Sequence, residues 1–145
     1  MNSFKVYTKS IRFVFFRKKD KGCLDGEITF LDDQIIVNDT VFTIDALENI
    51  HFSCFDDYTS RIINTAENKL SEGVGNAVEL YLNGNRKNIF YFQLTERYQI
   101  RDIREQLIHY HLAGKLDFLN LIAILGIEDY NAIQNFKQTL AFYGK

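Results

Sequence analysis

A change of hydrophobic period near residue 95 constrains the fold of this chain more than any other feature. Before it, apolar and polar side chains alternate, as they do over residues 24–31, which is the period of a strand with one buried face. After it, apolar side chains recur every three or four residues, as over residues 100–112, which is the period of an amphipathic helix. The sequence therefore predicts a strand-rich front followed by a helical back, an α+β fold.

Short alternating runs joined by tight turns predict an antiparallel arrangement of strands. The expected strands cover residues 10–17, 24–31, 34–37, 41–44, 50–55, 78–82 and 88–94. The turns at Asp32-Asp33, Asn38-Asp39 and Asn83-Gly84-Asn85 are typical of hairpins. A short helix starting near Ser3 competes with the first strand, so residues 3–17 are left open between the two. Residues 56–76 are polar and contain two closely spaced glycines, which indicates a long loop.

Three helices are expected after residue 95. The first runs from about Glu96 to the stop at Gly114. The second, Leu116 to Leu125, is apolar nearly all round, so it is either buried or part of an interface. The third begins at the cap Asp129. Its expected inner stripe is Tyr130, Ile133, Phe136 or Lys137, and Leu140. We expect residues 1–113 to form the main unit and residues 114–145 a helical extension packed on it.

Two stretches carry a resemblance to a known superfold. They are G-E-I-T-F-L-D-D-Q-I-I-V-N-D-T-V-F-T-I, residues 26–44, and V-E-L-Y-L-N-G-N-R-K-N-I-F-Y-F-Q-L, residues 78–94, which leads into a helix. Residues 10–113 as a whole resemble bacterial members of the pleckstrin-homology-like (PH-like) superfold. That resemblance implies a curled, antiparallel seven-strand barrel closed by a C-terminal helix, here followed by two further short helices. The superfold hosts many functions, so the resemblance implies no particular ligand.

Composition excludes some classes of partner and location. A formal net charge of −2 and a pI near 5.9 argue against non-specific nucleic-acid binding. Cys23 and Cys54 lie far apart in sequence and outside any metal-ligand spacing, which favours reduced thiols. Charged residues interrupt the N-terminal apolar stretches, so no signal peptide is expected. Together these features predict a cytoplasmic protein.

No catalytic, cofactor-binding or metal-binding residues are expected. His109 and His111 are two residues apart on a helix, and therefore point to nearly opposite sides instead of sharing a metal ion. His51 and Cys54 are three apart on a strand and point to opposite faces, unlike a nucleophile and its base. An enzyme whose site is assembled from scattered residues remains an alternative, for which a polar-lined pocket would be the structural evidence.

The favoured hypothesis is a non-enzymatic module that binds a protein partner or a second copy of itself. The second helix carries the candidate interface residues, which are Leu116, Phe118, Leu119, Ile122 and Leu125. Either the last helix covers them, which is favoured, or another subunit does, giving a dimer.

The alternative is binding to a membrane surface or a phosphorylated lipid. Its candidate residues are Arg17, Lys18, Lys19 and Lys21, which form a basic turn. In the resembling superfold, the loop between the first two strands often grips inositol phosphates. The strand that follows here offers Asp25 and Glu27, which repel phosphate, so a solvated turn is the favoured interpretation. Co-sedimentation with anionic vesicles, before and after neutralising the four residues, would test the alternative.

Overall fold

The structure is a computed structural model that describes residues 3–6, 26–55, 62–64, 69–70, 76–83, 86–96 and 98–143. The strands are β1 (Ser3–Val6), β2 (Gly26–Phe30), β3 (Gln34–Val37), β4 (Thr40–Thr43), β5 (Leu47–Cys54), β6 (Ile62–Asn64), β7 (Lys69–Leu70), β8 (Asn76–Leu82) and β9 (Arg86–Phe92). The helices are η2 (Ile44–Ala46), η3 (Gln99–Ile103), α1 (Arg104–Leu112), α2 (Phe118–Leu125) and α3 (Tyr130–Tyr143), where η marks a 3₁₀ helix.

The described strands form one seven-stranded sheet in the order β4-β3-β2-β1-β9-β8-β5, together with a separate β6-β7 pair. Every strand pair is antiparallel, which confirms the predicted α+β class and the hairpin connections. Closure into a barrel is not confirmed, because no ladder joins β4 to β5 among the described residues. The sheet therefore has two edges, β4 and β5.

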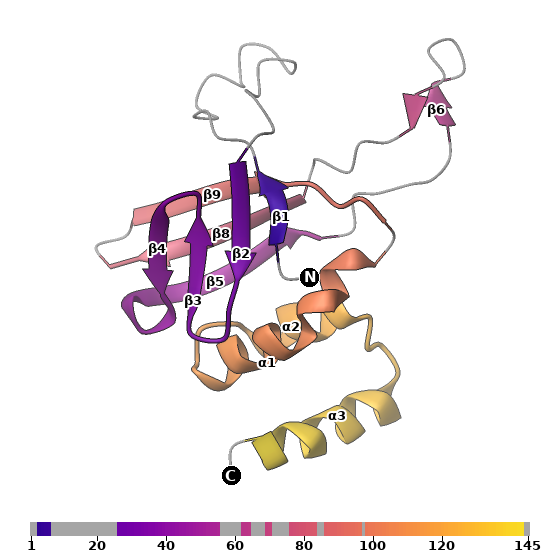
Figure 1. The fold of residues 1–145 in the computed structure, drawn as a ribbon. Helices are drawn as coiled ribbons and strands as arrows, with labels where there is room; N and C mark the ends of the chain where they lie inside the picture. The colour runs from indigo at the N-terminus through magenta and orange to yellow at the C-terminus, as the bar shows by residue number, and fades with distance from the viewer. Residues whose placement is uncertain are drawn as a thin grey trace.

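The sheet is strongly curled. The ring centres of Phe30 on β2 and Phe52 on β5 are 5.7 Å apart, although three strands separate β2 from β5. In a flat sheet, four strand spacings would place them roughly 19 Å apart. The first four strands stand in front while β5, β8 and β9 cross behind them (Figure 1). The rings of Phe4 and Phe92 fill the same interior, at 5.6 Å from each other.

The N-terminal prediction is corrected in part. Residues 3–6 form β1, which pairs with β2 and β9, so the competing helix near Ser3 is wrong there. Phe4 and Val6 point inward from β1, and this alternation over only four residues gave too short a signal to recognise. The strand expected over residues 10–17 lies outside the described residues. The expected loop 56–76 contains the short β6-β7 pair.

The helices gather at one end of the curled sheet, with α3 outermost (Figure 1). The first helix begins as the 3₁₀ segment η3 before α1, and both supply side chains to the core. Phe136 and Leu140 are the buried residues of α3. Tyr130 is 72% exposed, so the predicted inner stripe is wrong at its first position and takes Phe136 in place of Lys137. No helix in the described part of the chain is long and apolar enough to cross a membrane.

Caps at both ends fix the short helix α2. The side chain of Asp117 accepts hydrogen bonds from the amides of Leu119 and Asn120, which have no partner inside the helix. At the other end, Gly126 has φ +72°, a conformation that glycine adopts without a side-chain penalty. The amide of Ile127 then donates to the carbonyl of Ile122 at 2.9 Å, the long bond of a Schellman cap.

The chain that follows α1 covers the β5 edge of the sheet. The amide of Ile50 donates to the carbonyl of Lys115 at 2.8 Å. Two residues further along β5, the buried side-chain amide of Asn120 accepts a hydrogen bond from Phe52 N (2.9 Å) and donates one to Phe52 O (3.1 Å). The Asn120 side chain thus replaces the two hydrogen bonds that a neighbouring strand would make. This leaves β4 as the edge without such a cover among the described residues.

Candidate functional site

The structure separates the five candidate interface residues. Leu116 and Ile122 are buried, and Phe118 and Leu125 pack partly buried against the same core. Leu119 is 70% exposed. α2 lies against β5 with Asn120 directed at the strand, and in this orientation Leu121 is buried while Leu119, on the other side of Asn120, faces outward. The sequence predicted that α2 is apolar all round, but it could not show which turn stays uncovered.

The last helix covers less of α2 than the sequence predicted. The clearest contact between them is the stacking of Phe118 on Phe136, whose ring centres are 6.3 Å apart. The elements that pack most closely on α2 are β5, η3 and α1 instead. Phe142 on α3 is 77% exposed, as Leu119 is on α2. The C-terminal helices therefore present large apolar side chains to solvent, while most of the predicted interface is core.

The basic turn Arg17, Lys18, Lys19 and Lys21 lies outside the described residues. Lipid binding through it stays a prediction from sequence.

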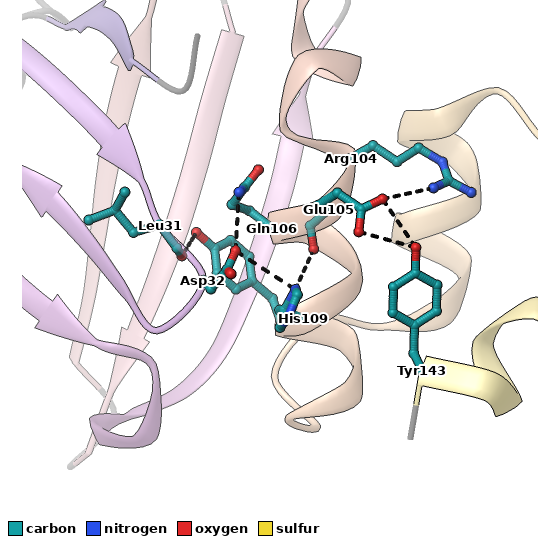
Figure 2. A network of polar contacts seen from close by, with 8 residues as sticks. Leu31, Asp32, Arg104, Glu105, Gln106, His109 and Tyr143 are labelled. Atoms are coloured by element: carbon teal, nitrogen blue, oxygen red, sulfur yellow. Dashed lines mark hydrogen bonds and ion pairs between the residues drawn. The ribbon is translucent and has the colours of Figure 1, made fainter. Parts of the chain in front are cut away.

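A polar network joins the β2–β3 turn to α1 (Figure 2). Gln106 donates to a carboxylate oxygen of Asp32 at 3.1 Å. Nδ1 of His109 lies 2.8 Å from the backbone oxygen of Glu105 and 3.8 Å from Asp32. His109 faces solvent as predicted, and His111 instead packs its ring on Phe118 at 5.7 Å. The network is an exposed clasp between helix and turn and contains no nucleophile.

The same helix anchors α3. The hydroxyl of Tyr143 donates to both carboxylate oxygens of Glu105 at 3.1 Å, and Arg104 binds that carboxylate at 3.2 Å (Figure 2). These groups are solvent-exposed, so each contact contributes only a fraction of a kcal/mol, about 0.2–1. The burial of Phe136 and Leu140 provides most of the attachment of α3.

Tyr110 forms the buried half of the clasp. Its hydroxyl donates to the carbonyl of Leu31 at 2.7 Å, at the start of the turn that carries Asp32. Burial, with smaller contributions from the charges of Asp32 and Asp33, raises the pKa of Tyr110 well above its usual range. The folded protein therefore keeps this hydroxyl protonated at pH values where the unfolded chain releases the proton.

We expect Tyr110→Phe to lower the free energy of unfolding by about 1 kcal/mol at pH 7, since the carbonyl of Leu31 loses its donor. A raised folded pKa stabilises the wild type below the unfolded value, about 10, and this stabilisation is lost as pH rises above it. Urea unfolding from pH 8 to 11 should show a steeper alkaline decline for the wild type than for the variant. Equal slopes would contradict the role given to the Tyr110 hydroxyl.

A second titrating pair lies on β8. The hydroxyl of Tyr81 donates to Glu79 at 2.7 Å, and Lys87 of β9 lies 3.8 Å from the same carboxylate. The Tyr81 hydrogen bond is the main reason that the pKa of Glu79 is lowered, and it also raises the pKa of Tyr81. Glu79 and Tyr81 lie two residues apart on one face of β8, and Lys87 reaches Glu79 from β9, so the group is typical of side chains that stabilise a sheet surface.

A hollow of about 260 Å³ lies beside the end of α2 and is lined in part by Tyr98, Arg101 and Glu128. Nε of Arg101 donates to the carbonyl of Ile124 at 3.3 Å, and its guanidinium stacks 4.1 Å from the centre of the Tyr98 ring. Gly126 leaves room for this guanidinium, which a Cβ there would strike. Arg101 thus binds a carbonyl that the helix end leaves free, which explains the hollow without a ligand.

No protein-family model, curated protein or solved structure matches the chain. Among the described residues, no group of three or more His, Cys, Asp or Glu side chains is placed to hold a metal ion.

Proposed function

We propose that this protein is a non-enzymatic binding module that recognises protein, and that its C-terminal helices contact a second copy of the chain. The observation that carries the proposal is the exposure of large apolar side chains on α2 and α3, Leu119 and Phe142 foremost. Removing a side chain of this size from water contributes about 1.5–3 kcal/mol. A few such side chains, set against the cost of association, favour a weak complex over a permanent one.

The PH-like assignment and the cytoplasmic location belong to the same proposal. One antiparallel seven-stranded sheet, curled on itself and followed by a helix at one end, supports the PH-like assignment. Two cysteines outside any disulfide-rich pattern support a reducing compartment. Within this superfold, binding surfaces differ from member to member, so the contact surface has to be argued from this chain.

Leu119→Asp should abolish self-association and leave the monomer folded. The substitution places a charge on the exposed apolar surface, and it lies in the first turn of α2, where a carboxylate is favoured by the helix dipole. Sedimentation equilibrium from about 10 μM to 1 mM should show the apparent mass rising for the wild type and constant for the variant.

Asn49→Asp is the matched control, because it adds the same charge at an exposed position on β5. It should associate as the wild type does. A wild type that stays monomeric over the whole concentration range would overturn the proposed self-association.

A further inference from the structure

We propose that the open edge of β4 is a docking site for an extended, basic segment of a partner protein, which would add to the sheet as an eighth strand. This surface is distinct from the helical one, and the inference does not depend on self-association. The backbone groups of β4, the packing beneath them and the charge around them support docking at this edge.

The register of the sheet shows which backbone groups of β4 face outward. The amide of Ile44 donates to the carbonyl of Asp33 on the β3 side at 3.0 Å. Backbone direction alternates along an antiparallel strand, so the groups of Thr40 and Phe42 also face β3. The groups of Val41 and the amide of Thr43 point away from the sheet, whereas the carbonyl of Thr43, the N-cap of η2, accepts the first hydrogen bond of that 3₁₀ helix. An incoming strand therefore meets two donors, the amides of Val41 and Thr43, and one acceptor, the carbonyl of Val41.

The β4 edge lacks three features that often prevent strand addition, namely Lys, Pro and a bulge. Exposed edges are commonly protected by Lys, Pro or a bulge. The T-V-F-T sequence of β4 contains no Lys or Pro, and its pairing with β3 is regular throughout. Val41 is 51% exposed. Beneath it, Phe42 packs on Phe90 of β9 with ring centres 5.9 Å apart, which supports the strand from inside. The opposite edge, β5, is covered by Asn120, so among the described residues β4 is the open edge of the seven-stranded sheet.

Charge identifies the class of partner. Residues 31–50 contain five carboxylates and no Lys or Arg. Asp39 and Asp45 flank β4 on either side, and Glu48 follows; all three are exposed and form no ion pair with another described residue. A strand with Lys or Arg at both ends and β-branched residues between them would place its charges opposite Asp39 and Asp45. Complementary charge of this kind fixes register and speeds association.

The same charges argue against a second copy at this edge. The self-pairing that uses the outward groups of both residues sets Val41 opposite Thr43 of the partner subunit. It also sets Asp39 opposite Asp45 of the partner subunit, and like charges directly opposite each other destabilise a strand pair. A basic segment of a different protein is therefore the favoured occupant.

A fluorescein-labelled peptide, Lys-Lys-Val-Thr-Val-Thr-Lys-Lys, is the probe. Fluorescence polarisation with the full chain should give a dissociation constant of about 10–100 μM at low salt, an affinity typical of a short added strand. The affinity should fall at least tenfold between 50 and 500 mM salt. A peptide with Glu in place of every Lys should not bind.

Val41→Pro is the decisive variant. Proline at a position whose N–H faces outward is tolerated in an edge strand, but it removes one docking donor and obstructs the incoming backbone. Binding should weaken at least tenfold, while Val41→Thr, which keeps the N–H and the strand propensity, binds as the wild type does. Leu119→Asp should also bind normally, which separates this site from the helical surface.

Circular dichroism confirms that each variant is folded. The inference is overturned if Val41→Pro is folded and binds the peptide unchanged, if the Glu peptide binds equally well, or if the wild type shows no binding at 1 mM.

Discussion

Asn120→Asp is expected to lower the free energy of unfolding by about 3 kcal/mol or more at pH 7. The amide of Asn120 both accepts from Phe52 N and donates to Phe52 O, and it is buried. A carboxylate keeps the first bond but turns the second into repulsion between two oxygens, with an ion held away from water. Breaking a buried pair in this way costs about 3–5 kcal/mol.

The loss should depend on pH. Burial would raise the pKa of the introduced carboxyl above its unfolded value of about 3.9, so the destabilisation appears as pH rises above that value. Below it, the protonated acid can donate to Phe52 O and most of the stability should return. Urea titrations at pH 3.5 and 7 measure this, with Asn135→Asp on the exposed face of α3 as the control. A loss below 1 kcal/mol at pH 7 would mean that Asn120 does not cover the β5 edge.

Phe30→Ala is expected to lower the free energy of unfolding by about 3–5 kcal/mol. Phe30 is fully buried, and its ring contacts Phe4, Phe52 and Phe92 from three other strands. Its removal leaves a cavity where the two layers of the curled sheet meet, and rings fixed on four strands cannot collapse into it. The free energy of unfolding of a typical domain is about 5–15 kcal/mol in total, so the variant should be close to unfolding.

Phe142→Ala is the matched control, since the same atoms are removed from a side chain that is 77% exposed. Its stability should change by less than about 0.5 kcal/mol. Chemical denaturation of dilute protein, where no dimer forms, measures both variants. Equal losses for Phe30→Ala and Phe142→Ala would contradict the curled sheet, because only curling brings Phe30 of β2 to Phe52 of β5.

Local sequence signals predicted most of the elements. Period two located β2, β3, β4, β5, β8 and β9, and the turn residues between them fixed the antiparallel hairpins. Asp129, the predicted cap, acts at the start of α3, where short-range chemistry decides the structure. These signals extend over a few residues, which is why they are legible in a single sequence.

Long-range contacts decided the rest. Asn120 was visible as a polar residue in an apolar helix, but its partner, Phe52, is 68 positions away and nothing local indicates it. The same holds for Leu119, whose exposure depends on which face of α2 packs against the sheet and α1. The open edge of β4 could not be predicted either, because a sequence does not show which strands end a sheet.

The residues that cover β5 bear on where the chain can be truncated and on when each part of it is synthesised. All seven strands of the sheet precede residue 95, yet the residues that cover its edge strand β5 lie at 115–120. A fragment ending at residue 113 would have two bare edges in place of one, and bare edges recruit strands from other molecules. During synthesis, too, all seven strands are made before residues 115–120, which cover β5. The helical extension therefore protects an edge that the strands made before it leave open.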